Sequence, residues 1–288
     1  MLLSSPIAEI GAHIQIKQDI YSTIQSAIEM GMYSFQFFMG SPKSFTRKQI
    51  TDNDIKKSQQ LISRFPMNIF SHAPYLFNLA GSKDCLAWNG DQTQDSKTMN
   101  VIKNVEYELS VISNFNNKYN GVIVHPGNNV NREKGLLAIA KSINKINFTE
   151  NSHLLLENTA GQGTSLCTTF LEIKTIIDNI DQDKLKYIGV CVDTAHIFGF
   201  GEYDISKLSE MIRMFDEFEK VIGIDYLKLI HLNDSAAKLK TRKDRHQLIG
   251  DGYIWSENKN SLEYLLNFCK KHDIPIVLET EPHDVYKF

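Results

Sequence analysis

Residues 188–196 read IGVCVDTAH, a short apolar run that ends in an aspartate and a histidine. A continuous apolar run bounded by polar residues is typical of a strand that is buried on both faces of a sheet. The pattern recurs, and we expect strands at residues 10–16, 33–39, 68–72, 121–125, 153–157, 188–193, 227–231 and 275–279. Segments with helical spacing separate them, at residues 19–30, 55–65, 98–115, 134–143, 170–180, 205–220 and 260–272.

This alternation of strand and helix predicts an α/β fold with a parallel sheet covered on both faces. Eight such strands predict closure into a single (β/α)₈ TIM barrel, with an open, doubly wound sheet as the alternative. The chain has 288 residues and is 42% hydrophobic, which suits one barrel domain spanning residues 1–288. Only nine residues follow Glu279, so we expect the final helix to be shortened or missing.

Composition limits the class of protein further. The four cysteines have neither paired spacing nor a C-x-x-C motif, which favours a reduced, intracellular protein. No segment is apolar for the length of a membrane span, so we expect a soluble protein with no membrane partner. We also expect a monomer. The formal charge of −3 argues mildly against a nucleic-acid partner. Three divalent ions would add about six positive charges in one place, so the net charge decides little.

Nine imidazole and carboxylate side chains lie at the ends of the expected strands or in the loops that follow them. They are His72, His125, Glu157, Asp193, His196, His231, Asp244, His246 and Glu279. In a barrel these strand ends converge on one face, where active sites lie. Four buried carboxylates and five imidazoles would be severely unfavourable without cations. Imidazole and carboxylate together suit zinc best, with manganese or iron as further possibilities.

The motifs that carry these residues match a known family. VCVDTAH (190–196), ENTAGQG (157–163) and HLND (231–234) followed by DRH (244–246) resemble the endonuclease IV class of apurinic/apyrimidinic endonucleases, and the resemblance runs from IGAH (10–13) to VLET (277–280). It implies three zinc ions in the barrel mouth. The first would be held by His72, His125 and Glu157, the second by Glu157, Asp193, His231 and Glu279, and the third by His196, Asp244 and His246.

The resemblance also implies a DNA-repair reaction. A double-stranded DNA with an abasic site would be cut 5′ to the lesion, leaving a 3′ hydroxyl and a 5′ deoxyribose phosphate. Metals suit this chemistry because the phosphodiester repels hydroxide and its leaving alkoxide is poor. Glu157 and Glu279 are the expected catalytic carboxylates. The damaged nucleotide must be turned out of a bent duplex, which costs least where pairing and stacking are already lost.

Four further residues are candidates for contact with DNA. Tyr75 resembles the family residue that packs against exposed bases. In the GSPKSF loop, Ser41, Lys43 and Phe45 stand where family members commonly have Asn, Arg and Trp. Lysine keeps the charge of arginine and loses its planar fork, so this loop is expected to hold DNA differently from its relatives.

Two other functions remain open on sequence alone. Sugar isomerases and epimerases of the xylose isomerase type also carry Glu, Asp, His and Glu at successive strand ends of a barrel. The five additional candidate ligands have no place in such a site, because it holds one or two metals. A catalytically silent DNA-binding protein on the same fold is the second alternative; loss of a ligand is its usual mark, and here every position is filled.

Overall fold

The computed structural model describes residues 10–81, 96–257, 259–280 and 282. Its centre is a closed barrel of eight parallel strands, in the order β1-β2-β3-β4-β5-β6-β7-β10 and back to β1. The strands are β1 (Ile10–His13), β2 (Ser34–Phe37), β3 (Asn68–His72), β4 (Gly121–Val124), β5 (His153–Glu157), β6 (Ile188–Asp193), β7 (Leu227–His231) and β10 (Ile276–Leu278). This arrangement confirms the barrel and excludes the open, doubly wound sheet.

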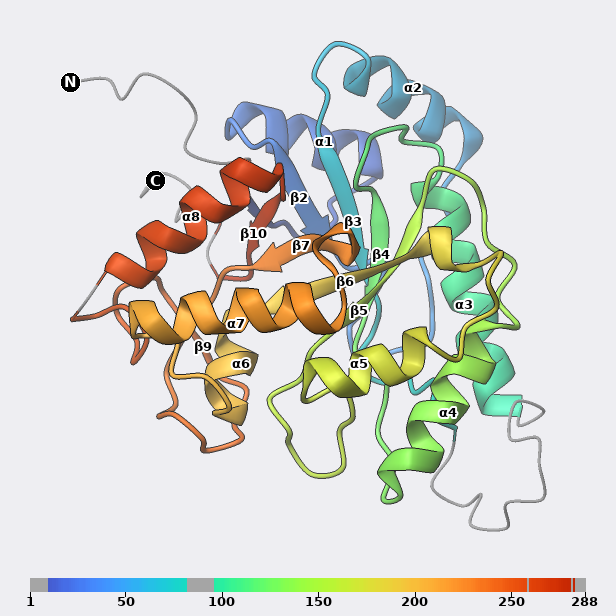
Figure 1. The fold of residues 1–288 in the computed structure, drawn as a ribbon. Helices are drawn as coiled ribbons and strands as arrows, with labels where there is room; N and C mark the ends of the chain where they lie inside the picture. Colours follow the sequence, from blue (N-terminus) through green and yellow to red (C-terminus); the bar gives the residue numbers. More distant parts are fainter. Residues whose placement is uncertain (1–9, 82–95, 258, 281, 283–288) are drawn as a thin grey trace, which may run out of the picture.

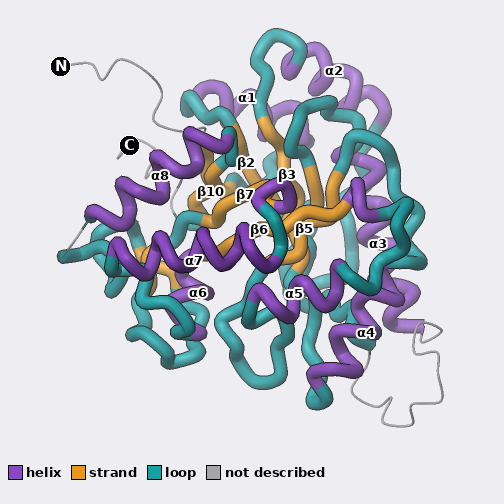
Figure 2. The backbone as a smooth tube through the Cα atoms, in the orientation of Figure 1, coloured by secondary structure: helices purple, strands orange, loops and turns teal. Residues whose placement is uncertain are grey.

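Helices pack around the outside of the barrel (Figures 1 and 2). They are α1 (Ile20–Glu29), α2 (Asp52–Ile62), α3 (Ser96–Ile112), α4 (Arg132–Ile143), α5 (Phe170–Ile177), α6 (Thr194–Phe200), α7 (Leu208–Val221) and α8 (Asn260–His272), with short 3-10 turns at Leu185–Tyr187 and Ile224–Tyr226. The side chains of Asp19, Thr51, Asn131 and Thr169 accept first-turn N–H groups of α1, α2, α4 and α5. Such caps fix where each helix begins. No helix in the described residues is long and apolar enough to cross a bilayer.

The observed strands and helices follow the predicted ones closely. The expected strands at residues 68–72, 153–157, 188–193 and 227–231 coincide with β3, β5, β6 and β7, and the others are one to three residues shorter than expected. The expectation of a shortened or missing final helix concerns the residues after Glu279, nearly all of which lie outside the described part of the chain.

Two elements at the barrel mouth were not predicted. Helix α6 follows β6 with no intervening turn, because Asp193 ends the strand and its carboxylate also caps the helix through the backbone N–H of His196 (2.7 Å). The short antiparallel strands β8 (Asp234–Ser235) and β9 (His246–Gln247) form a ribbon after β7. The buried carboxylate of Asp234 shapes the turn that follows, by accepting the backbone N–H groups of Gly250, Gly252 and Ile254.

Two apolar clusters hold the fold together. The larger lies between the barrel and its helices and includes the outward residues of the strands, such as Leu154 and Leu156 of β5. The smaller cluster is made by Phe70, Tyr119, Ile123, Leu155, Cys191, Leu229 and Val277. All of its members except Tyr119 come two positions before a candidate ligand, so they form the layer directly beneath the barrel mouth.

Candidate metal centre

The alternation of side chains along the strands points the candidate ligands into the barrel. Leu155 belongs to the apolar layer inside the barrel, and Glu157 follows two residues later on the same face. The same step of two leads from Cys191 to Asp193 and from Leu229 to His231. The apolar layer therefore supports a polar layer at the carboxyl ends of the strands.

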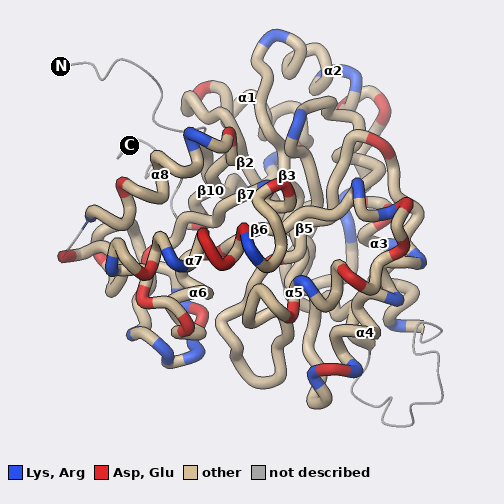
Figure 3. The backbone as a smooth tube through the Cα atoms, in the orientation of Figure 1, with Lys and Arg blue, Asp and Glu red and all other residues tan. Residues whose placement is uncertain are grey.

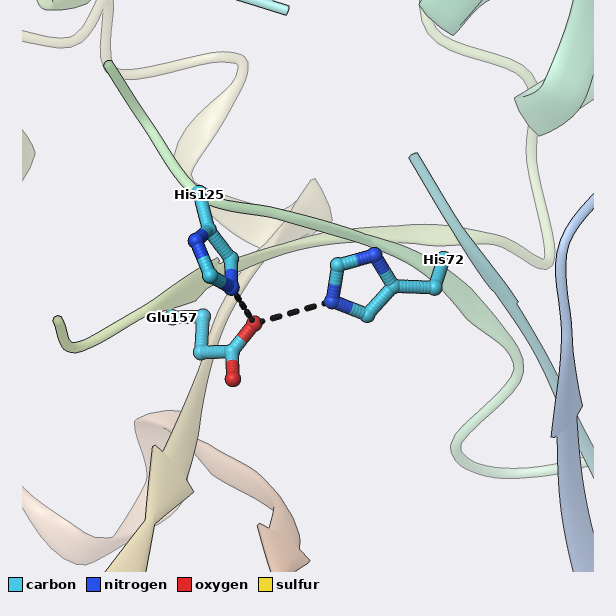
Figure 4. Close-up of side chains that lie close together, drawn as sticks. All are labelled: His72, His125 and Glu157. Carbon is cyan, nitrogen blue, oxygen red and sulfur yellow. Dashed lines mark hydrogen bonds and ion pairs between the residues drawn. The ribbon is translucent and has the colours of Figure 1, made fainter. Parts of the chain in front are cut away.

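Glu157 joins two groups of ligands. Its Oε2 lies 3.1 Å from Nε2 of His72 and 3.0 Å from Nε2 of His125, as Figure 4 shows. Its Oε1 lies 3.0 Å from Nδ1 of His231. The carboxylate is fully buried and faces a different set of imidazoles with each oxygen. This is the arrangement expected of a bridging ligand between two metals.

The second group is completed by carboxylates from β6 and the end of β10. His231 Nδ1 lies 3.4 Å from Glu279 Oε2 and 4.0 Å from Asp193 Oδ2. Ligand atoms of these three residues and Glu157 lie within 4.8 Å of one another. Cys191 Sγ also lies within 4.8 Å of ligand atoms of Glu157 and His231, but burial raises the pKa of its thiol to about 12 and keeps it neutral. We assign Cys191 to the apolar layer beneath the site.

The third group is more open. Asp244 Oδ2 lies 3.2 Å from His196 Nε2, and Asp244 Oδ1 lies 3.1 Å from His246 Nε2, so the carboxylate spans the two imidazoles. Ligand atoms of the two histidines also lie within 4.8 Å of one another and of Asp193. We favour Asp244, because His196 Nδ1 donates to the carbonyl of Asn158 (2.9 Å) and only Nε2 is free to bind an ion.

Neighbouring groups orient several of the ligands. His72 Nδ1 donates to the carbonyl of Ala73 (2.7 Å), which leaves Nε2 toward Glu157. A carbonyl oxygen only accepts, so the position of the proton follows from the contact. The side chain of Asn233 donates to Asp193 Oδ2 (2.7 Å) and Glu279 Oε2 (2.9 Å), and so fixes both carboxylates.

The electrostatics of this mouth fit bound cations. Burial opposes ionisation of Glu157, but His125 and His231 outweigh it and hold its pKa well below the usual value. Burial likewise opposes protonation of His246, yet Asp193, Asp244 and Glu279 raise its pKa to about 9. Protons on the imidazoles thus supply the positive charge that divalent ions would supply.

One unsatisfied atom gives a more specific indication. Nε2 of His246 is buried and forms no well-directed hydrogen bond within the described residues, although Asp244 is near. A buried polar nitrogen without a partner costs free energy, and a metal ion at that position would remove the cost. All nine predicted ligands therefore meet in one mouth, and their donor set fits zinc.

The predicted DNA contacts lie beside this centre and not within it. The half-exposed ring of Tyr75 packs against His72 and His125, with ring centroids 5.7 and 5.6 Å away. Its backbone N–H donates to the carbonyl of Pro42 (3.2 Å), which joins it to the GSPKSF loop. Lys43 and the side chain of Ser41 are exposed on that loop, whereas the Phe45 ring stacks on Phe77 (5.5 Å).

Sequence reasoning missed several residues that hold the ligands. Asn158 and Asn233 lie inside motifs already recognised, ENTAGQG and HLND, and their position beside a ligand was the available signal. Arg47 stabilises the GSPKSF loop. Its guanidinium donates to the carbonyls of Ser41 and Ser44 and pairs with the buried Glu108 (3.4 Å). Nothing in the local sequence marked that pairing, because it joins the loop to α3.

Comparisons with known proteins identify similar chains. A family described as "Xylose isomerase-like TIM barrel" matches residues 24–259. "Probable endonuclease 4" of Methanosphaera stadtmanae is 37% identical over 282 residues, covering 96% of this chain and 94% of that protein. "Probable endonuclease 4" of Halothermothrix orenii is 32% identical over 278 residues, covering 94% and 92%.

Solved structures show the same fold. Endonuclease IV from Thermus thermophilus has a TM-score of 0.78 at 23% identity, covering 96% of this chain and 95% of that one. A D-tagatose 3-epimerase-like protein has a TM-score of 0.66 at 17% identity, covering 96% and 93%. The barrel fold is thus shared with a protein named for its likeness to a sugar epimerase. The two relatives identified by sequence, in contrast, are both named as endonucleases. By its similarity along nearly the whole length of these relatives, the chain belongs to the endonuclease IV family.

Proposed function

We propose that this protein is a zinc-dependent endonuclease that hydrolyses the phosphodiester 5′ to an abasic site in double-stranded DNA, leaving a 3′ hydroxyl and a 5′ deoxyribose phosphate. The observation that carries the proposal is the convergence of nine ligands in one barrel mouth, including the group around Asp244. A site for one or two metals would leave that group without a role. Manganese or iron would also suit some of the positions.

Each group of ligands has a place in this reaction. His72, His125 and Glu157 would hold one ion, Glu157, Asp193, His231 and Glu279 a second, and His196, Asp244 and His246 a third. Bound divalent cations would supply Lewis acidity that activates water and neutralises charge on the phosphoryl and leaving oxygens. The side chains of the protein would set the spacing of the ions and the charge around them. Glu157 and Glu279 are the catalytic carboxylates, because each faces ligands of more than one group.

A hollow beside the ligands gives room for the DNA backbone. It has a volume of about 470 Å³, and its lining includes Tyr75, His125, His196 and Asp244. Residues of the ENTAGQG loop, among them Gln162, also line it. A lesion without a base would enter such a hollow at the lowest cost, because its stacking is already lost.

A second hollow continues from the first and is strongly basic. It has a volume of about 710 Å³, shares Gln162 and Gly163 with the first, and is lined by Lys238, Arg242, Lys243 and Arg245. Figure 3 shows this concentration of Lys and Arg on the loop next to α6. No ion pair to these four side chains is found within the described residues, so their charge is available to phosphates.

The backbone of this basic loop is anchored to α6. The N–H groups of Lys240 and Arg242 donate to the carbonyls of Phe198 (3.1 Å) and Gly199 (2.8 Å). The cations are therefore presented on a fixed backbone next to the helix that carries His196. This placement supports the proposal that a DNA strand runs from the metal centre across the loop. It also provides a local positive charge for DNA on a protein whose overall charge is −3.

The test is cleavage of a duplex with one abasic site at a known position. Pure protein should cut on the 5′ side and leave an end that a polymerase extends, and a chelator should abolish the cut. Glu279→Gln, which keeps the size of the side chain, is the matched inactive control. Failure to cut abasic DNA, together with metal-dependent epimerisation of a ketose, would overturn the proposal in favour of the sugar-enzyme alternative. Specific binding of abasic DNA without cleavage would favour the silent DNA-binding alternative.

A further inference from the structure

Gln36 lies on β2, where sequence reasoning assigned no functional residue. Its side chain is fully buried inside the barrel at the level of the ligands. The amide contacts three groups of the mouth: Oε1 lies 2.6 Å from His231 Nε2, and Nε2 lies 2.8 Å from Glu279 Oε1 and 3.1 Å from His13 Nδ1. Every hydrogen-bonding position of this amide but one acceptor site is therefore used.

The chemistry of the partners fixes the orientation of the amide. Glu279 is a carboxylate and only accepts hydrogen bonds, so the group 2.8 Å from its Oε1 must be the NH₂ of Gln36. The opposite orientation would place two oxygens against each other. The carbonyl oxygen of Gln36 then faces His231 and can only accept, so His231 carries its proton on Nε2.

This orientation has a consequence for each partner. With its proton on Nε2, a neutral His231 presents the lone pair of Nδ1 to Glu157 and Glu279. Glu279 is held through Oε1 by Gln36 and through Oε2 by Asn233, which fixes the rotation of its carboxylate. His13 accepts at Nδ1, so it serves as a neutral support and not as a ligand.

We propose that Gln36 is a positioning residue for the second group of ligands, orienting His231 and Glu279 together so that both present a lone pair to the same ion. The proposal rests on the metal centre of the proposed function. It follows from hydrogen-bond geometry around one amide. Partners of this kind typically contribute about 10- to 100-fold to metal affinity.

The experiment measures zinc affinity of each site by competition with a chromophoric chelator. The first variant is Gln36→Met, which keeps length and volume but removes all three hydrogen bonds. The second is Gln36→Asn, which keeps a buried amide that is too short to reach both partners. The control is Ser34→Ala on the same strand, which removes a buried hydrogen bond to the carbonyl of Ile276 (2.9 Å), a residue that is not a candidate ligand.

We expect both Gln36 variants to weaken one of the zinc sites at least about tenfold and to leave the others unchanged. The zinc-loaded wild type should show a sharp, exchange-protected imidazole N–H proton signal from His231, which the variants lose and Ser34→Ala keeps. A folded Gln36→Met or Gln36→Asn protein with wild-type affinities and that signal intact would overturn the proposal. A wild type that binds zinc as expected but does not cut abasic DNA would instead overturn the proposed function alone.

Discussion

The third group of ligands offers a selective perturbation, the double substitution Asp244→Ala and His246→Ala. It removes the carboxylate beside His196 Nε2 and the neighbouring imidazole, which leaves too few donors to hold an ion there. The other groups keep their contacts, because the deleted His246 imidazole approaches their carboxylates only at 3.6 Å (Asp193) and 3.7 Å (Glu279). The Asp244 side chain is 35% exposed and His246 is 23% exposed, so the fold should survive.

The size of the effect follows from the role assigned to the group. The backbone of the loop stays anchored through Ala236, whose N–H donates to the carbonyl of Arg245 (2.9 Å), so unfolding free energy should change by about 1 kcal/mol or less. Loss of a strong electrostatic stabiliser of the leaving oxygen costs about 3 kcal/mol or more, which is at least about a hundredfold in rate. Cleavage should therefore suffer far more than folding.

The assay is single-turnover cleavage of a duplex with one abasic site, at protein concentrations well above the dissociation constant. Metal content and circular dichroism are measured on the same samples. We expect a folded variant that lacks one ion, binds the duplex within a few-fold of wild type and cuts at least about a hundredfold more slowly. A folded variant that lacks one ion and cuts at the wild-type rate would refute the three-metal account and make the DRH segment a structural loop.

Three further predictions concern DNA binding and pH. Lys43→Ala should weaken binding of abasic DNA and lower the slope of log affinity against log salt by about 0.9. The rate at which bound DNA is cleaved should change little. An unchanged slope would show that the GSPKSF loop does not contact DNA. The double variant Lys238→Ala and Lys243→Ala should lower that slope by about 1.8, whereas the control Lys56→Ala on α2 should not alter it. Because the metal-free site raises the pKa of His246 to about 9, this imidazole must lose a proton to bind an ion. Zinc affinity of the third group should then rise at least about tenfold per pH unit below that value, because the carboxylates around His196 raise its pKa as well. Calorimetry showing neither this rise nor proton release would contradict the assignment.

Much of the fold could be predicted because barrel strands carry a strong signal. Several strands are short, largely apolar runs that end in a polar residue, and the predicted runs at residues 153–157 and 188–193 match β5 and β6 at both ends. Helix α6 was missed because Asp193 belongs to both the strand and the helix cap, so no turn residue separates the two. The ribbon of β8 and β9 was missed because strands of two residues are too short to show an alternation of apolar and polar side chains.

The ligand set could be predicted because the carboxyl ends of the strands converge in a barrel. Polar residues at successive strand ends in the sequence must therefore lie close together in space. The supporting residues could not, because their roles depend on partners far away in the chain. Gln36 meets His231 across 195 residues, and Arg47 meets Glu108 across 61. Only the three-dimensional arrangement shows that one amide orients ligands from two other strands.

The central claim is that cleavage beside an abasic site requires three ions in this barrel mouth. Metal-free protein can be titrated with zinc while bound metal and single-turnover cleavage are measured in the same samples. The account predicts that cleavage follows the fraction of chains that hold three ions, that the product ends lie 5′ to the lesion, and that magnesium does not replace zinc. Full-rate cleavage by chains that hold only one ion, or no cleavage by chains that hold three, would contradict it.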